Sequence, residues 1–252
     1  MEHVSQSDSV LTAREVRPEE LEQAGRLRWA YFVEQRGWVE GGPGAVEFDR
    51  YDPHALHLGV FEHGRLLAYL RVLTADAPTG LMLDHDFRAC LTPGQHAALP
   101  RTRLVELSRR VVAPGLTAGQ VRMAVELLFM LFHSVARERG FEHVLVVQEP
   151  RQRRVLQRCF GIELAPLNAE PYTFEDGTSV TVDVATLASL RAALAATARL
   201  ERYERFHHAR VPPLPPRPSR PSARPSRPSA PRPPRSAPPA FRGVLAEGDR
   251  PA

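Results

Sequence analysis

The hydrophobic pattern of the chain predicts strands and helices in alternation. Six apolar runs have the length and composition of strands, and they lie at residues 10–16, 56–62, 65–74, 103–113, 143–148 and 178–184. Four longer segments have helical periodicity, and they lie at residues 18–35, 118–139, 150–160 and 185–208. This order predicts an α/β domain with helices on both faces of one mixed sheet.

Individual residues sharpen some of these boundaries. Pro18, followed by two glutamates, is typical of a helix start, and Gly37 is expected to end that helix. The His-Gly pair at 63–64 predicts a tight turn between two strands of a hairpin. The helix at 118–139 is apolar almost all round, so we expect it to be buried. The stretch 75–103 is mostly irregular, and a loop of this length in a compact domain is usually functional or mobile.

All 33 basic residues of the 252-residue chain are arginines, and they stand against 29 acidic residues. Residues 210–240 contain seven arginines, 13 of the 24 prolines and no acidic residue, a composition that cannot bury enough surface to fold. We therefore expect a globular domain at 1–209 and a disordered tail at 210–252. The domain alone has fewer basic than acidic residues, so nucleic acid is expected to bind only weakly, through the tail.

The remaining composition excludes several classes of protein. Cys90 and Cys159 are too few for a disulfide framework, and they lack the spacing of a zinc site. The first 15 residues lack the basic start and apolar core of a signal peptide. The longest apolar stretch, 124–132, is too short to cross a bilayer. We therefore expect a cytoplasmic protein with no membrane span. The spacing of the histidines fits no standard metal-ligand set, so no metal site is expected.

Charged residues gather in segments that are otherwise apolar. They are Arg28, Glu47, Asp49, Asp52, Arg71, Glu106 and Arg109. A charge inside an apolar strand is costly unless it is paired, so these groups either form a buried ion-pair network or face a polar pocket. Glu106 and Arg109 are three residues apart, and a regular strand would point them to opposite faces. A bulge near Leu107 or Ser108 would bring them to one face, and bulges recur beside active sites.

Several of these residues stand in segments that resemble a known family. The segments are LRWAYFVEQRGW (27–38), EFDRYD (47–52), LMLDHDF (81–87) and VELSRR (105–110), together with Arg71 in its strand. In this order they are similar to the acyl-homoserine-lactone synthases, the autoinducer synthases of bacterial quorum sensing. The resemblance covers roughly residues 10–200. It implies a three-layer αβα GNAT-like acyltransferase fold with a central mixed, splayed sheet.

Two other segments resemble the related N-acyl amino acid synthases, which share the fold and the acyl-carrier-protein donor but acylate an amino acid. These segments are HALHL (54–58) and QEP (148–150). Arg110 also stands where the lactone synthases usually have an aromatic residue. No RxxGxG/A pyrophosphate loop follows VELSRRVVAPG, which makes acetyl-coenzyme A a weaker donor than an acyl group on a carrier protein.

The resemblance implies attack of an amine on a thioester. S-adenosylmethionine would be the acceptor substrate, acylated on its amine and then lactonised, and no tightly bound cofactor is expected. Glu106 is the candidate base that takes the proton of the amine, and Asp49 and Arg109 complete the predicted catalytic group. Backbone N–H groups at 110–113 would stabilise the oxyanion. The predicted substrate-binding residues are Arg28, Phe32, Trp38, Asp52, Arg71 and Phe87; ordinary core packing is the alternative for Phe32 and Trp38.

The donor requires an apolar slot and a docking surface. The candidate acyl-pocket residues, which would suit a plain core equally well, are Val125, Leu128, Phe129, Phe132, Val144 and Val146. Acyl carrier proteins are acidic, so a cluster of arginines is a candidate docking patch. Its residues on the helix at 150–160 are Arg151, Arg153, Arg154 and Arg158, and a solvated helix face is the alternative.

These observations predict an N-acyltransferase that moves a fatty acyl group from an acyl-carrier protein to the amine of S-adenosylmethionine, giving an N-acyl-homoserine lactone. The first alternative is an N-acyl amino acid synthase, or another GNAT N-acyltransferase with a carrier-protein or coenzyme A donor. The alternative from another class is a non-catalytic acyl-binding module, and the intact set of charged residues argues against it.

Overall fold

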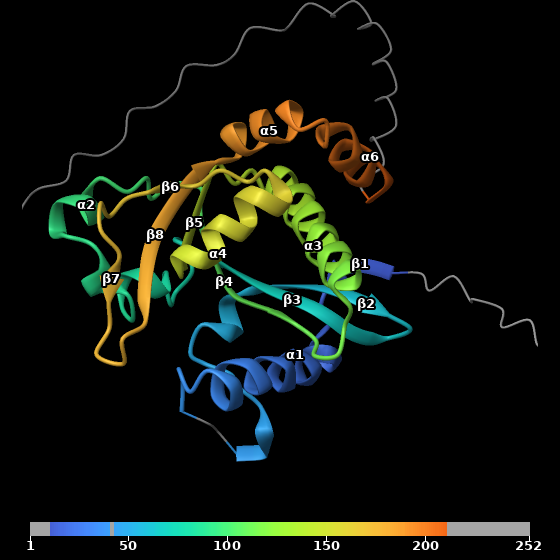
Figure 1. The fold of residues 1–252 in the computed structure, drawn as a ribbon, viewed down its shortest axis with the longest axis horizontal. Helices are drawn as coiled ribbons and strands as arrows, with labels where there is room; N and C mark the ends of the chain where they lie inside the picture. Colours follow the sequence, from blue (N-terminus) through green and yellow to red (C-terminus); the bar gives the residue numbers. More distant parts are fainter. Residues whose placement is uncertain (1–10, 41–42, 211–252) are drawn as a thin grey trace, which may run out of the picture. The chain divides into compact units, whose positions relative to one another are not determined.

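The strands form a mixed sheet with the order β1-β2-β3-β4-β5-β8-β6, and β7 pairs with β8 (Figure 1). The computed structural model describes residues 11–40 and 43–210, so the predicted tail lies outside the described residues apart from Arg210. The strands are β1 (Leu11–Glu15), β2 (Leu56–Glu62), β3 (Arg65–Thr74), β4 (Leu104–Val112), β5 (His143–Gln148), β6 (Ala165–Pro166), β7 (Tyr172–Thr173) and β8 (Ser179–Thr186). Paired strands are antiparallel except β4 and β5, which are parallel. The predicted mixed sheet is confirmed.

The helices begin and end close to the predicted boundaries. They are α1 (Leu21–Arg28), which continues through a π-helical segment (Trp29–Gln35), α2 (Pro93–Ala97), α3 (Ala118–Arg139), α4 (Pro150–Val155), which continues through a second π-helical segment (Leu156–Phe160), α5 (Leu187–Ala196) and α6 (Leu200–Arg210). Five short 3₁₀ turns lie at Pro18–Glu20, Pro43–Ala45, Asp52–His54, Met82–Asp84 and Arg88–Cys90. None of these described helices is long and apolar enough to cross a membrane.

The helices lie in two layers on either side of the sheet. α1 and α3 lie on opposite faces of the first four strands (Figure 1). On the α3 face, Leu128 and Phe132 pack against Leu70 of β3, and α4, α5 and α6 pack around α3. On the α1 face, Phe32 packs against Tyr69, and the segment 75–103 covers the rest of that face. The three-layer αβα fold is confirmed.

The parallel pair β4–β5 opens partway along its length. Their pairing runs from Leu104 opposite His143 to Leu107 opposite Val146, whereas β4 continues to Val112. Parallel neighbours that stop pairing leave a gap between their ends in which a ligand can lie. This is the splay that the resemblance implies.

A bulge in β4 lies just beyond the point where the strands part. Tyr69 pairs with Val111 and Arg71 with Ser108, so Arg109 and Arg110 together lie opposite a single residue of β3, Leu70. Arg109 adopts a left-handed conformation with φ 52°, which is uncommon for a residue other than glycine. The bulge that was expected near Leu107 or Ser108 exists, and it lies at Arg109 and Arg110.

The prediction of a single helix at 185–208 is wrong, because the chain breaks between α5 and α6. Ala198 has φ 55°, and Arg199 donates a hydrogen bond to the carbonyl of Cys159 at 2.9 Å. This hydrogen bond holds the break against the end of the second π-helical segment. Leu194 and Tyr203, on either side of the break, both enter the cluster around α3. Tertiary packing therefore overrides a continuous run of good helix formers.

Gly59 in β2 makes the close packing of the α1 face possible. A β-carbon at this position would lie 2.7 Å from Cε2 of Phe61 and 2.8 Å from Cδ1 of Leu66, and both side chains are buried. Gly59→Ala is therefore expected to lower the free energy of unfolding by about 1–3 kcal/mol, because the added β-carbon would force two buried side chains to shift. Chemical denaturation measures this. Gly119→Ala is the matched control: an added β-carbon there meets nothing within 4 Å, so this helix substitution should be neutral or slightly stabilising.

Candidate active site

Arg28 of α1 is fully buried and pairs with two carboxylates from the segment 47–52. Its Nε lies 2.5 Å from Oε2 of Glu47, and its NH1 lies 2.6 Å from Oδ1 of Asp52. The loop between α1 and β2 thus returns its acidic residues to the helix that precedes it. A buried guanidinium is stable only with such partners.

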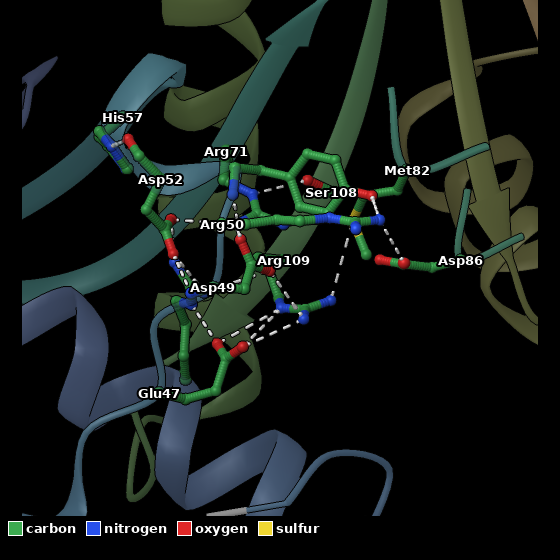
Figure 2. A network of polar contacts seen from close by, with 12 residues as sticks. Glu47, Asp49, Arg50, Asp52, His57, Arg71, Met82, Asp86, Ser108 and Arg109 are labelled. Atoms are coloured by element: carbon green, nitrogen blue, oxygen red, sulfur yellow. Dashed lines mark hydrogen bonds and ion pairs between the residues drawn. The ribbon is translucent and has the colours of Figure 1, made fainter. Parts of the chain in front are cut away.

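Two further arginines bind the same acidic segment from the sheet (Figure 2). Arg71 of β3 lies 2.6 Å from Asp49 and 3.0 Å from Asp52. Arg109 of β4 lies 3.0 Å from Glu47 and 3.1 Å from Asp49. Three arginines from three elements therefore hold three carboxylates from one loop, a set that we call the arginine network. Of the two arrangements expected from the sequence, the ion-pair network exists, and Arg109 connects it to the cavity described below.

Further polar contacts extend the arginine network at both ends. Arg71 also donates to the hydroxyl of Ser108 at 3.0 Å. His57 contacts the hydroxyl of Tyr69 at 2.7 Å and the carbonyl of Asp52 at 3.0 Å, and burial lowers the pKa of the imidazole. Burial opposes ionisation of Asp52, but the neighbouring guanidiniums outweigh it and lower the pKa of this carboxyl to about 2. Asp52 therefore stays charged across the physiological pH range.

A cavity of about 760 Å³ lies where β4 and β5 part. Its walls come from the first π-helical segment and the loop after it, the segment 82–87, β4, β5 with α4, and the region 172–180. The residues used below are Tyr31, Phe32, Trp38, Phe87, Glu106, Ser108, Arg109, Arg110 and Gln152. A volume of this size is typical of a small-molecule site.

Glu106 is a buried carboxylate in the wall of this cavity. Its side chain is 1 % exposed, and its Oε2 accepts a hydrogen bond from the backbone N–H of Leu83 at 3.1 Å. Burial raises the pKa of Glu106 to about 7, although the Leu83 N–H and the charge of Arg71 act in the opposite direction. A carboxylate with such a pKa can exchange a proton near neutral pH.

The predicted site residues divide into two groups. Phe32, Trp38, Phe87, Glu106 and Arg109 line the cavity. Arg28, Asp49, Asp52 and Arg71 lie behind its wall in the arginine network. The bulge explains why Glu106 and Arg109 share one cavity although they are three residues apart. The catalytic and binding roles of both groups stay predictions.

Four of the six predicted acyl-pocket residues lie around a second, smaller cavity of about 50 Å³. Phe129, Phe132, Val144 and Val146 line it, and Phe129 and Val146 also line the larger cavity. The two cavities therefore share walls on the α3 side of the sheet. Val125 does not line this cavity and packs with the second π-helical segment, α5 and α6. Leu128 does not line it either and packs in the main core between α3 and the sheet.

The predicted docking arginines differ in their surroundings. Arg151, Arg154 and Arg158 are exposed on α4 and the π-helical segment that follows it. Arg153 lies 3.3 Å from the buried Asp183, so it also holds α4 to β8. Arg36 pairs with Glu149 at 2.5 Å and lies over the ring of Trp38 at 3.8 Å. The ion pair between Arg36 and Glu149 joins the two sides of the cavity.

Sequence reasoning missed several residues of the cavity wall. Gln152 carried no signal, because it stands in no quoted motif, and Tyr31 was passed over although it lies inside the segment LRWAYFVEQRGW (27–38). Arg110 and Glu149 stood in segments that departed from the lactone-synthase pattern, and this departure was the available signal. No group of three or more His, Cys, Asp or Glu residues suited to a metal ion occurs in the described part of the chain.

Comparison with known proteins places this geometry in a family. The family model of the N-acyl amino acid synthase FeeM matches residues 23–173, a range that contains the arginine network and most of the cavity wall. The chain belongs to this family. It is an N-acyltransferase of the acyl-homoserine-lactone synthase and FeeM type. No curated protein matches the chain.

Several solved structures have the same fold. The coenzyme A-dependent acyl-homoserine lactone synthase BjaI, solved with MTA, matches with a TM-score of 0.60 and 20% identity over 79% of this chain and 98% of that chain. The AHL synthase LasI matches with a TM-score of 0.58 and 19% identity over 75% and 96%. FeeM from uncultured soil microbes matches with a TM-score of 0.57 and 16% identity over 75% and 98%. At these identities the likeness shows a shared fold.

Removing one cation from the arginine network should destabilise the fold strongly. Arg28→Met takes one arginine partner from each of the carboxylates of Glu47 and Asp52 and leaves only Arg109 and Arg71 to balance them, so we expect the free energy of unfolding to fall by about 3–5 kcal/mol. Arg26→Met on the same helix is the matched control, because Arg26 and its partner Glu22 are exposed. The control should change stability by no more than about 0.5 kcal/mol. Equal stabilities of the two variants would contradict the network's structural role.

The raised pKa of Glu106 predicts opposite effects of pH on activity and on stability. Only the carboxylate form can accept a proton, so kcat/KM should rise as the pH passes about 7. The folded state favours the protonated form, so this group's contribution to the free energy of unfolding should fall by about 3 kcal/mol between roughly pH 4.5 and 8. Glu106→Gln removes both effects, with a loss of turnover on the order of 10²-fold.

Denaturation of wild type and Glu106→Gln over this pH range measures the effect on stability. Initial rates over the same range measure the effect on kcat/KM. The mutant should unfold with less pH dependence than the wild type. A folded mutant with wild-type turnover would exclude Glu106 as the base.

Proposed function

We propose that this enzyme transfers an acyl group from a carrier-protein thioester to the α-amine of an acceptor that is an amino acid or S-adenosylmethionine. The observation that carries the proposal is Glu106, a buried carboxylate with a pKa of about 7 in the wall of a large cavity. Within residues 11–40 and 43–210, no arginine lies within 4.0 Å of this carboxylate to hold it ionised. It is therefore the group best suited to accept a proton from an amine.

The proposed reaction forms one bond and breaks another. The neutral amine attacks the thioester carbonyl carbon, the C–N bond forms and the C–S bond breaks, and the thiol leaves with a proton. Glu106 accepts the proton that the amine loses, directly or through a water molecule. Backbone N–H groups of β4 beyond the bulge would stabilise the oxyanion, because the pairing of β4 with β5 ends at Leu107.

The arginine network supports this chemistry by fixing one wall of the cavity. Arg109 lines the cavity while its guanidinium pairs with Glu47 and Asp49, so it cannot swing freely into the space that the acceptor occupies. A preorganised wall loses little conformational entropy when a substrate binds. The apolar side of the larger cavity at Phe129 and Val146, where it adjoins the smaller one, is the proposed site of the acyl chain.

A product assay tests the function directly. The purified full chain is incubated with acyl-carrier proteins loaded with chains of different length, or with the corresponding acyl-coenzyme A, and with S-adenosylmethionine or each free amino acid. Mass spectrometry identifies the acylated product, and release of methylthioadenosine reports lactone formation. We expect an N-acyl product from the carrier-protein donor. The absence of an acylated acceptor in every combination would contradict the proposal.

Charge reversal on α4 tests the carrier-protein donor. Arg151, Arg154 and Arg158 are exposed, so their replacement by glutamate should raise KM for the acidic carrier protein and flatten its salt dependence. Arg153 is left in place because of its contact with Asp183. The matched control reverses three exposed arginines on other elements, Arg17, Arg26 and Arg65. Equal KM values for the two triple variants would indicate that α4 is a solvated helix face and not a docking patch.

A further inference from the structure

Two arginines line the large cavity, and they differ in their partners. Arg109 pairs with Glu47 and Asp49. Arg110 donates a hydrogen bond to Oε1 of Gln152 on α4 at 2.8 Å. Across residues 11–40 and 43–210, no carboxylate oxygen lies within 4.0 Å of the Arg110 guanidinium. Arg110 is thus a cation of the cavity wall without an acidic partner of its own.

Arg110 is half-buried, and the partial loss of hydration lowers the pKa of its unpaired guanidinium. The side chain is nevertheless held in place, because Gln152 orients one of its five N–H donors. The remaining donors form a planar fork, and such a fork fits the two oxygens of a carboxylate with parallel hydrogen bonds. The site is therefore charged, oriented and still able to bind an anion.

We propose that Arg110, oriented by Gln152, binds the α-carboxylate of the acceptor. This inference rests on the proposed function, in which Glu106 receives the proton of the acceptor's α-amine. It assigns a partner to the acceptor's other polar group, the α-carboxylate. An α-amino acid carries its amine and its carboxylate on one carbon atom. Glu106 and Arg110 lie on the same strand and line the same cavity, and the aromatic wall formed by Tyr31, Phe32 and Trp38 is suited to the rest of the acceptor.

This assignment has a consequence for the product. Lactone formation from an acylated S-adenosylmethionine requires the carboxylate oxygen to attack the carbon that carries the sulfonium, so that a C–O bond forms and methylthioadenosine leaves. A carboxylate held by a guanidinium in two hydrogen bonds is stabilised as an anion and is a weaker nucleophile. Acceptors bound by Arg110 therefore leave the enzyme as open-chain N-acyl amino acids.

The test compares acceptors that differ only in the carboxylate. L-phenylalanine, L-methionine and S-adenosylmethionine are each assayed beside the corresponding carboxamide, with wild type, Arg110→Met, Arg110→Lys and the exposed control Arg122→Met. The amine of a carboxamide is less basic, so an enzyme indifferent to the carboxylate would favour the amide. We expect the wild type to favour the acid, and Arg110→Met to lower kcat/KM for the acid on the order of 10- to 100-fold, mainly through KM. Arg110→Lys should recover part of this loss.

The outcomes separate this inference from the proposed function. Equal losses of kcat/KM for acid and amide in Arg110→Met would overturn the role of Arg110. A rise in KM for the acyl donor alone would also overturn it, because it would indicate that Arg110 binds a phosphate of the donor. Calorimetric titration of each acid and amide into the full chain without donor tests the same contrast independently of turnover. Binding of the acid that is lost in Arg110→Met, with no acylated product in any assay, would support the carboxylate site and contradict the proposed reaction.

Discussion

The buried pairing of three arginines with the acidic segment 47–52 is the interaction on which the rest of the site depends. Arg28 comes from α1, Arg71 from β3 and Arg109 from β4, so one loop fastens the helix layer to the sheet. Each guanidinium would be unstable in the core without its carboxylates, and each carboxylate would be unstable there without its guanidiniums. The loop, the helix and the bulged strand therefore form as a unit.

The bulge in β4 turns this structural network into one wall of a cavity. Because Arg109 and Arg110 lie opposite a single residue of β3, the side chains beyond the bulge change face relative to a regular strand. Arg109 keeps its contact with Glu47 and still reaches the cavity that Glu106 lines. The same short stretch stands where β4 loses its pairing with β5. One local irregularity thus supplies the opening and the polar groups that face it.

The fold was largely predictable from sequence because its elements have strong periodic patterns and clear ends. The helix at Ala118–Arg139 and the strand at His143–Gln148 lie where the pattern predicts them. The bulge was inferred from the spacing of Glu106 and Arg109, but its position depends on the ion pair between Arg109 and Glu47, which are 62 residues apart. Helical periodicity likewise placed Val125 and Phe129 together, whereas only the packing of α4 to α6 decides which of them meets a cavity. Long-range contacts of this kind leave no local pattern in the sequence.

The absence of lysine from this chain has a chemical consequence for a protein that handles activated acyl groups. A thioester reacts with any neutral primary amine within reach, and the ε-amine of a lysine is such a group. Guanidinium groups stay protonated and are not nucleophilic under these conditions. The cations around the cavity and on α4, Arg36, Arg109, Arg110, Arg151 and Arg154 among them, can therefore attract acidic partners and substrates without intercepting the acyl group. The surface therefore offers no lysine amine to the acyl group while it remains positively charged where the donor is expected to approach.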